Sequence, residues 1–315
     1  MMTGKLKQVA VIGGGLVGSG WAVVFARAGI PVRLFDASED IRQGAPSRIR
    51  ASLSDMQEFG LVSDVDAIAQ RIEVVDSLVD AVSAANYVQE SVFERVDVKK
   101  AVSAEIGAAM RDDAVVGSSS SGIPASAFTD QAPRRSRFLI AHPVNPPHLV
   151  PLVELVAAPW TDPEIVPWLR EAMEQVGQVP IVVNREIEGF ILNRLQGALL
   201  NEAWALLDAG LASVADIDRT VAHGLGLRWS FMGPFETIDL NAPGGIDDYA
   251  QRLGTLYHSI AQDRRDPKPW SPDLIEFATA ERREILAKPE LEARSAWRNR
   301  RLMALISHKR DQPEC

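Results

Sequence analysis

The chain has 315 residues, of which 46% are hydrophobic and 24% are charged, a composition typical of globular proteins whose length suits two domains. Its net charge of −9 argues against a nucleic-acid partner, because phosphate backbones attract basic surfaces. No apolar run approaches the ~18 residues of a membrane span, and the run that begins at Val9 is too short for a secretory signal. The single cysteine, Cys315, excludes an internal disulfide and favours a reducing compartment. We therefore expect a cytoplasmic protein that binds neither nucleic acid nor membrane.

The first half of the chain alternates short apolar runs with helical stretches. Residues 8–12 form a β-branched run typical of a strand buried on both faces. Glycines follow, then residues 21–28 predict a helix, and residues 31–35 predict a second strand that closes a βαβ unit. This alternation predicts a Rossmann-type, mostly parallel sheet domain over residues 1–185. Further apolar runs lie at 87–88, 114–117, 138–141, 150–156 and 179–183.

From about residue 186 the pattern becomes helical. Residues 189–209 carry apolar side chains at helical spacing, and Ser213 is a candidate N-cap for the next helix. No later segment has the pattern of a strand. We therefore predict an all-helical C-terminal domain over residues 186–315.

A glycine-rich motif lies between the first predicted strand and the first predicted helix. Gly13 permits a tight turn, Gly15 lets the backbone approach a pyrophosphate, and Gly18 lets helix and strand pack closely. Asp36 ends the second strand, 18 residues after Gly18, where a carboxylate binds the adenosine ribose hydroxyls and repels a 2′-phosphate. The combination predicts NAD rather than NADP as the cofactor. A glycine-rich turn in an unrelated α/β protein is the alternative.

A histidine and a glutamate are candidates for the chemistry. His142 follows the apolar run 138–141, which places it at the carboxyl end of a strand, where open α/β sheets bind ligands. Oxidation of a secondary alcohol removes the hydroxyl proton, and a neutral imidazole is the usual base near pH 7. Glu154 lies in an apolar run, and a buried carboxylate needs a partner. We predict that Glu154 orients His142. The alternatives are a core histidine bonded to backbone and an exposed glutamate on an edge strand.

Two further polar features accompany this pair. Residues 118–121 are four serines that follow a predicted buried strand, so they form either a solvated loop or a place where a hydroxyl meets the substrate oxygen. Asn193 lies among apolar residues of a predicted helix and needs hydrogen-bond partners if it is buried. A bound substrate or a serine would supply them.

Taken together, these motifs resemble the L-3-hydroxyacyl-CoA dehydrogenase family. The resemblance rests on the glycine motif, the serine run, HPVNPP at 142–147, Glu154 and GFILNR at 189–194, and it covers nearly the whole chain. The segments GLGLRW at 224–229 and MGPFET at 232–237 are similar in particular to the branch that contains lambda-crystallin, with L-gulonate 3-dehydrogenase activity.

The resemblance implies NAD-dependent oxidation of the 3-hydroxyl of a small L-3-hydroxy acid, without a metal ion. His142 is then the general base and Glu154 its orienting carboxylate, while Ser121 and Asn193 contact the substrate oxygen. The resemblance and the apolar first helix of the second domain also imply a homodimer. Positions that match contacts to the nicotinamide half of the cofactor are Glu94, Lys99 and Asn145. For Glu94 and Lys99 the alternative is a surface pair.

The chain departs from the acyl-CoA members of the family in one region. Those members carry a lysine-rich helical hairpin after the second strand that grips the CoA phosphates, whereas residues 37–70 contain no lysine and more acids than arginines. We therefore expect a free acid such as L-gulonate, with Arg228 as a bidentate clamp for its carboxylate. An exposed helix-end arginine is the other interpretation of Arg228.

Three other functions stay open at this point. One is an L-3-hydroxyacyl-CoA dehydrogenase, and another is a carnitine 3-dehydrogenase, whose quaternary ammonium needs an aromatic or anionic cage. The residues Trp229, Phe231 and Phe235 leave that possibility open. The third is an NAD(H)-binding structural or sensor protein, which has no reason to retain the His142–Glu154 pair.

Overall fold

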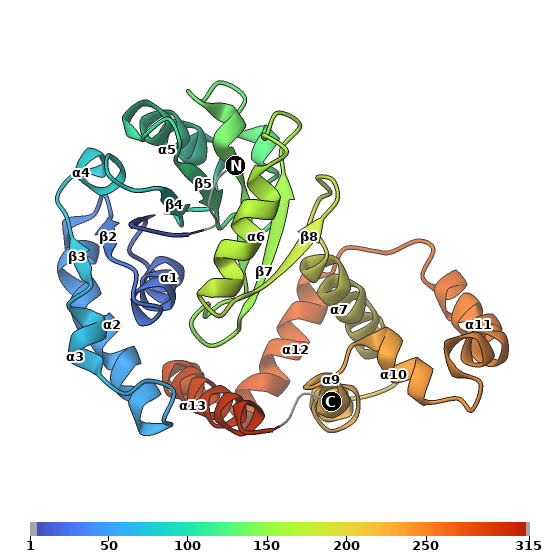
Figure 1. The fold of residues 1–315 in the computed structure, drawn as a ribbon. Helices are drawn as coiled ribbons and strands as arrows, with labels where there is room; N and C mark the ends of the chain where they lie inside the picture. The colour runs from blue at the N-terminus through green and yellow to red at the C-terminus, as the bar shows by residue number, and fades with distance from the viewer. Residues whose placement is uncertain (1–4, 313–315) are drawn as a thin grey trace. The chain divides into compact units, whose positions relative to one another are not determined.

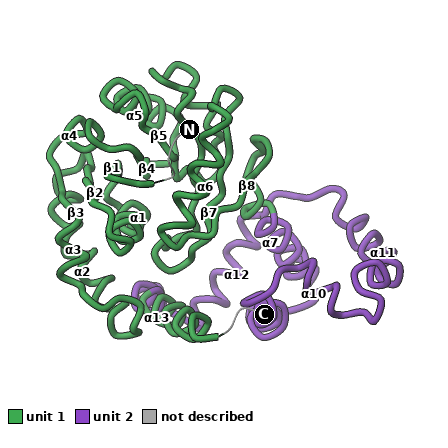
Figure 2. Tube along the Cα trace, viewed as in Figure 1, with its two compact units in different colours: residues 1–194, 296–315 green, residues 195–295 purple. Residues whose placement is uncertain are grey.

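The computed structural model describes residues 5–312, so Cys315 lies outside the described residues. The chain divides into two compact units (Figure 2): unit 1 comprises residues 1–194 and 296–315, and unit 2 comprises residues 195–295. Unit 1 contains the sheet and unit 2 is helical, which confirms the predicted fold class (Figure 1). No helix within residues 5–312 combines the length and the apolarity needed to cross a membrane.

Unit 1 is built on one eight-stranded sheet with the strand order β3-β2-β1-β4-β5-β6-β7-β8. All neighbouring strands are parallel except β6 and β7, which are antiparallel. The chain reverses its direction of progress between β1 and β4, and open α/β sheets bind nucleotides at such a point, beyond the carboxyl ends of the strands. The strands are β1 (Val9–Ile12), β2 (Val32–Phe35), β3 (Ile72–Val74), β4 (Tyr87–Glu90), β5 (Val115–Ser118), β6 (Phe138–Pro143), β7 (Leu152–Ala157) and β8 (Val179–Val183).

Helices cover both faces of this sheet. Alternate residues of β1 show why: Val9 and Val11 pack in one apolar cluster with α1, α2 and α6, whereas Ala10 and Ile12 pack in a second cluster with α4 and α5. A strand that is buried on both faces needs the continuous apolar run seen in the sequence. The helices are α1 (Leu16–Arg27), α2 (Glu39–Glu58), α3 (Val65–Ala69), α4 (Leu78–Val82), α5 (Val96–Ala109) and α6 (Ile165–Gln175).

The C-terminal helix α13 (Leu291–Arg310) packs against unit 1 through its later turns. Met303 is buried in the same cluster as α1 and α2. Arg300 forms salt bridges with Glu58 at 2.7 Å and with Asp55 at 3.5 Å, both on α2. The helix therefore covers part of the α2 surface with both apolar and ionic contacts.

Helices are the only regular elements within residues 195–295, as the sequence predicts, and loops connect them. The side chain of Ser213 accepts a hydrogen bond from the backbone N–H of Asp216, which confirms its role as an N-cap. A short π-helical turn, Val221–Leu225, separates α8 from α9. The helices are α7 (Leu192–Asp208), α8 (Val214–Thr220), α9 (Gly226–Trp229), α10 (Pro234–Leu240), α11 (Gly245–Asp263) and α12 (Pro272–Ile285).

Candidate active site

The glycine-rich turn between β1 and α1 has the geometry that a dinucleotide requires. Gly13 has a φ of +104°, and a Cβ on it would clash with the backbone of Ser91. A Cβ on Gly18 would clash with the carbonyl of Gly13, so helix and strand approach as closely as the motif predicts. A Cβ on Gly15 would meet no atom within 4 Å, which leaves its backbone open to a phosphate. The helix N-terminus that follows, at Leu16, favours a negative charge. These residues fit the pyrophosphate of NAD.

Asp36 lies beside this turn, at the end of β2. Its carboxylate accepts hydrogen bonds from the backbone N–H of Gly14 at 2.7 Å and of Ser38 at 2.9 Å. The side chain of Arg42 donates to the backbone carbonyl of Asp36 rather than to its carboxylate. The acid is thus fixed next to the phosphate turn, in the position that the adenosine ribose takes in this type of site.

His142 and Glu154 are directly opposite each other on the antiparallel strands β6 and β7. The His142 Nδ1 lies 2.7 Å from Glu154 Oε2, and both residues are buried, Glu154 completely at 0% exposure. Because an ionised carboxylate only accepts hydrogen bonds, Nδ1 is the donor, and Nε2 of the neutral ring is left unprotonated. Since β7 has neighbours on both sides, the interpretation of Glu154 as an exposed edge residue is wrong.

The second oxygen of Glu154 is also occupied. Glu154 Oε1 accepts hydrogen bonds from the backbone N–H of Ile191 at 2.8 Å and of Leu192 at 3.0 Å, at the start of α7. Burial raises the pKa of Glu154, but the hydrogen bonds from His142, Leu192 and Ile191 lower it by more than burial raises it. The pKa of Glu154 therefore lies below its ordinary value. Glu154 therefore stays ionised and fixes both the imidazole and the beginning of α7.

The turn before α7 has an unusual backbone. Gly189 has a φ of +74° and Phe190 a φ of +50°, a conformation rare for a bulky side chain. Phe190 is fully buried and its ring centroid lies 5.8 Å from that of His142. Strained residues of this kind cluster at functional sites. The sequence pattern gave no indication of this strain at Phe190.

The serine loop after β5 is tied to α7 and to Glu94. Asn193 Nδ2 donates to the backbone carbonyl of Ser121 at 2.5 Å. Glu94 Oε1 accepts from the backbone N–H of Ser121 at 2.8 Å and of Gly122 at 3.1 Å, and from Ser120 Oγ at 2.8 Å. The structure thus brings Ser121, Asn193 and Glu94 together, and Asn193 directly follows the residues that Glu154 holds.

Glu94 and Lys99, the two charged residues of this region, differ in their exposure to solvent. Burial raises the pKa of Glu94, but the nearby Lys99 ammonium and the hydrogen bonds from Ser120, Ser121 and Gly122 lower it more, so the pKa of this carboxyl lies below its usual range. Lys99 is completely buried, so a surface pair with Glu94 is the wrong interpretation.

Sequence reasoning missed Glu90, the last residue of β4. It is buried, and its carboxylate contacts Lys99 Nζ at 3.0 and 3.1 Å. The argument applied to Glu154, that a carboxylate within a buried strand needs a partner, would have found it.

Asn145 and Arg228 are the other predicted site residues. Asn145 is exposed, two residues beyond the end of β6 and therefore at the carboxyl edge of the sheet. Arg228 is exposed on α9 of unit 2, and within residues 5–312 its guanidinium forms no salt bridge. It is therefore available to a carboxylate ligand.

The doubly wound sheet and the glycine-rich turn after β1 together define an NAD-dependent oxidoreductase of the α/β type. Residues 8–187 match the NAD binding domain of 3-hydroxyacyl-CoA dehydrogenase, and residues 189–285 match the C-terminal domain of the same enzyme. The chain belongs to the 3-hydroxyacyl-CoA dehydrogenase family, and NAD is its cofactor.

Known relatives show how wide this family is. The chain is 36% identical to lambda-crystallin of Oryctolagus cuniculus, over 98% of each chain. It is also 36% identical to L-carnitine dehydrogenase of Streptomyces coelicolor, over 79% of this chain and 78% of that one. Among solved structures it is similar to 5-formyl-3-hydroxy-2-methylpyridine 4-carboxylic acid 5-dehydrogenase, an NAD⁺-dependent dismutase, with a TM-score of 0.85, 28% identity and coverage of 98% and 100%.

Proposed function

We propose that this protein oxidises the 3-hydroxyl of a small L-3-hydroxy acid with NAD, and that His142 is the general base and Glu154 its orienting carboxylate. The observation that carries the proposal is the 2.7 Å contact between His142 Nδ1 and a Glu154 carboxylate that is fully buried and held by two backbone amides. A buried carboxylate–imidazole pair with both carboxylate oxygens hydrogen-bonded, at the carboxyl end of a sheet strand, is the arrangement of an activated base.

In the forward reaction His142 Nε2 takes the hydroxyl proton of the substrate. Glu154 stabilises the imidazolium that forms, because it is negatively charged and already bonded to Nδ1. Bound NAD would supply the acceptor for the hydride that leaves carbon 3 of the substrate, the carbon that carries the hydroxyl. In this proposal Ser121 and Asn193 bind the substrate oxygen, and Glu94, Lys99 and Asn145 serve the nicotinamide half of the cofactor site.

The arginines of the α2–α3 hairpin favour a free acid over a CoA thioester. All three are engaged within unit 1: Arg42 donates to the carbonyl of Asp36, Arg48 to the carbonyl of Gly14, and Arg50 pairs with an aspartate. A polyanionic nucleotide handle therefore finds no free cation on this hairpin.

Two similar proteins whose names give an acid as the substrate support the same choice. One is named for carnitine and the other for a pyridine carboxylic acid. We take L-gulonate as the representative substrate and Arg228 as the residue that binds its carboxylate.

The direct test measures NADH production by the purified protein with L-gulonate, L-3-hydroxybutyrate, L-carnitine and L-3-hydroxybutyryl-CoA in parallel. We expect a free acid to be turned over with the highest kcat/KM, and Arg228→Gln to raise its KM. A thioester with the highest kcat/KM would contradict the substrate proposal and leave the base assignment standing. Binding of NADH without oxidation of any alcohol would favour the structural or sensor function.

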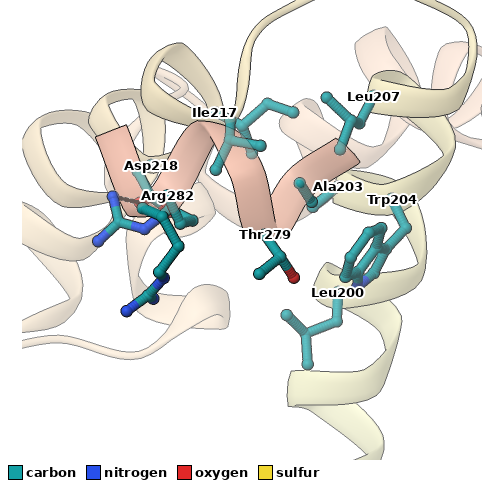
Figure 3. A pocket seen from close by; sticks show the side chains of 11 residues that line it. Leu200, Ala203, Trp204, Leu207, Ile217, Asp218, Thr279 and Arg282 are labelled. Carbon is teal, nitrogen blue, oxygen red and sulfur yellow. Dashed lines mark ion pairs between the residues drawn. The ribbon is translucent and has the colours of Figure 1, made fainter. Parts of the chain in front are cut away.

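We also propose that the protein is a homodimer through unit 2. Within residues 195–295 only Leu207 and Ala278 are buried hydrophobic residues. A cavity of about 340 Å³ lies between α7, α8 and α12, and Leu200, Ala203 and Trp204 form its apolar wall on α7 (Figure 3). A helical unit with so few buried side chains needs a further surface to cover it, and a second copy supplies one symmetrically. Sedimentation equilibrium distinguishes a dimer from a monomer.

Two expectations about the whole chain stay predictions. We place the functional boundary between the cofactor domain and the helical domain near residue 186, and limited proteolysis of the full chain, followed by an NADH-binding assay of the products, tests it. The cytoplasmic location rests on Cys315, and fractionation of cells that produce the protein tests it.

A further inference from the structure

Charged side chains lie beneath the serine loop, out of reach of solvent. Lys99 is 0% exposed and Glu90 is 1% exposed. Glu90 ends β4 and pairs in the sheet with Ser118, which ends β5 and is also buried. Removing two charges from water is unfavourable unless their geometry and their remaining hydrogen bonds are good. Stability alone therefore does not explain why a charged pair is buried at this edge of the sheet.

Glu90 is fully hydrogen-bonded in this position. Its Oε1 accepts from the backbone N–H of Val92 at 2.7 Å and from Lys99 Nζ at 3.0 Å. Its Oε2 accepts from Ser118 Oγ at 2.5 Å and from Lys99 Nζ at 3.1 Å. One side chain thus joins the segment after β4, the end of β5 and helix α5.

Lys99 extends this network toward the surface. Its ammonium lies 3.4 Å from Glu94 Oε2, and the Glu94 side chain is partly exposed. The other oxygen of Glu94 accepts from the backbone N–H of Ser121 and Gly122. Because Lys99 is inaccessible, it acts on a ligand through Glu94 and not by contact.

The adenosine half of the cofactor site is held differently. The Asp36 carboxylate accepts from the backbone N–H of Gly14, and no member of the buried cluster takes part in that contact. The backbone of Ser91 and Val92, the two residues after Glu90, approaches the turn at Gly13. The side-chain contacts of the cluster lead through Glu94 to the serine loop and not to Asp36, so a change in the cluster should act mainly on the nicotinamide half.

We propose that Glu90 and Lys99 are positioning residues that hold Glu94 and the serine loop in the conformation that receives the nicotinamide half of NAD. The proposal rests on the proposed function for the roles of Glu94 and Ser121. It assigns to Glu90, which no motif marks, the task of fixing that half of the site.

The experiment compares two ligands that differ only in the nicotinamide group. The dissociation constants of NADH and of ADP-ribose are measured by calorimetry for the wild type, Glu90→Gln and Lys99→Met. We expect NADH binding to weaken about tenfold, the scale of one or two lost hydrogen bonds, while ADP-ribose binding changes by less than about twofold. The matched control is Glu105→Gln, the same loss of charge at an exposed position of α5, and both constants stay at their wild-type values.

Two results would overturn the proposal. If the binding of NADH and of ADP-ribose weakens equally, the Glu90–Lys99 pair supports the fold in general. If NADH binding does not weaken, the pair has no role in the cofactor site. If Glu90→Gln does not fold, Ser118→Ala removes the hydrogen bond to Glu90 together with those that Ser118 Oγ accepts from Lys99 and from the backbone N–H of Ser120, and it is judged by the same ratio of constants. Since binding needs no substrate, the result is independent of the oxidation assays, in which failure of the proposed function shows as an inactive wild type.

Discussion

The two units of this protein bury their side chains to very different degrees. Unit 1 packs its sheet between helices on both faces, and even charged residues such as Glu154 and Lys99 lie inside it with complete sets of partners. Unit 2 has almost no buried apolar side chain and exposes large ones along most of its helices. They include Leu211, Leu227, Phe231, Phe235, Leu240 and Leu256.

This difference in burial suits the two units to different tasks. The proposed base and the cofactor turn must be held within fractions of an ångström, and both lie at packed strand ends of unit 1. Unit 2 has helices of definite length but only two buried hydrophobic residues between 195 and 295, so under the dimer proposal its stability depends on a surface outside itself. Changes in unit 1 should therefore act on chemistry and folding at any concentration, whereas changes in unit 2 should act through association.

The largest effect is expected at the pair in unit 1. His142→Gln and Glu154→Gln each lower kcat by roughly 10²–10⁴-fold, the usual scale for loss of a general base or its partner. Steady-state NADH production measures kcat, and calorimetric titration with NADH serves as the control for an intact cofactor site. Turnover near the wild-type value with intact NADH binding would contradict the assignment.

A second prediction concerns the helix that returns to unit 1. Met303 is 2% exposed, whereas Leu305 on the same helix is 40% exposed. Met303→Ala therefore lowers the free energy of unfolding of unit 1 by about 2–4 kcal/mol, because it leaves a cavity in a packed cluster, and Leu305→Ala lowers it by less than about 1 kcal/mol. Urea denaturation of the two variants compares them directly. Equal losses would mean that α13 does not pack as described.

A third prediction concerns pH and His148, which follows β6. Burial, with a smaller effect from the nearby Arg27 guanidinium, lowers the pKa of His148 from 6.5 to about 4. The folded protein keeps this ring neutral while the unfolded chain protonates it, so its contribution to stability is present above pH 6.5 and is lost as the pH falls from 6.5 to about 4. The loss is of the order of 3 kcal/mol.

The measurement is urea denaturation at several pH values in this window. In His148→Leu the part of the slope due to this residue disappears, whereas replacement of His308, an exposed histidine on α13, leaves the wild-type slope. The contribution of Glu154 has the same sign but a lower range, since its pKa lies below the ordinary carboxyl value. An unchanged slope in His148→Leu would show that the pKa of His148 is the same in the folded and the unfolded protein.

Much of unit 1 can be predicted from sequence because its signals are local. The apolar run at 8–12, the glycine turn and the acid at Asp36 each follow from the neighbouring residues alone. The pairing of His142 with Glu154 follows from one rule about buried carboxylates and is confirmed as a contact by their strand register.

Other features depend on long-range packing. The Glu90–Lys99 pair needs the register of β4 against β5 and the placement of α5, none of which appears in a local pattern. The packing of α13 on α2 is equally hidden, because its sequence is rich in arginine and only a few apolar residues, such as Met303, reach the core. The positive φ of Phe190 results from the turn into α7, and no residue preference predicts it.

The prediction with the smallest expected effect concerns unit 2 and its proposed dependence on a second copy of the chain. If a dimer covers unit 2, the melting temperature rises with protein concentration, by about 2–4 °C for each tenfold increase, since association stabilises only the folded state. Ala203→Arg places a charge in the apolar wall of the unit 2 cavity and should abolish this dependence and halve the mass in sedimentation equilibrium. Ala104→Arg, an exposed position on α5, is the matched control and keeps the dimer. A melting temperature independent of concentration in the wild type would mean that unit 2 holds together without a partner, and its exposed apolar surface would then need another ligand.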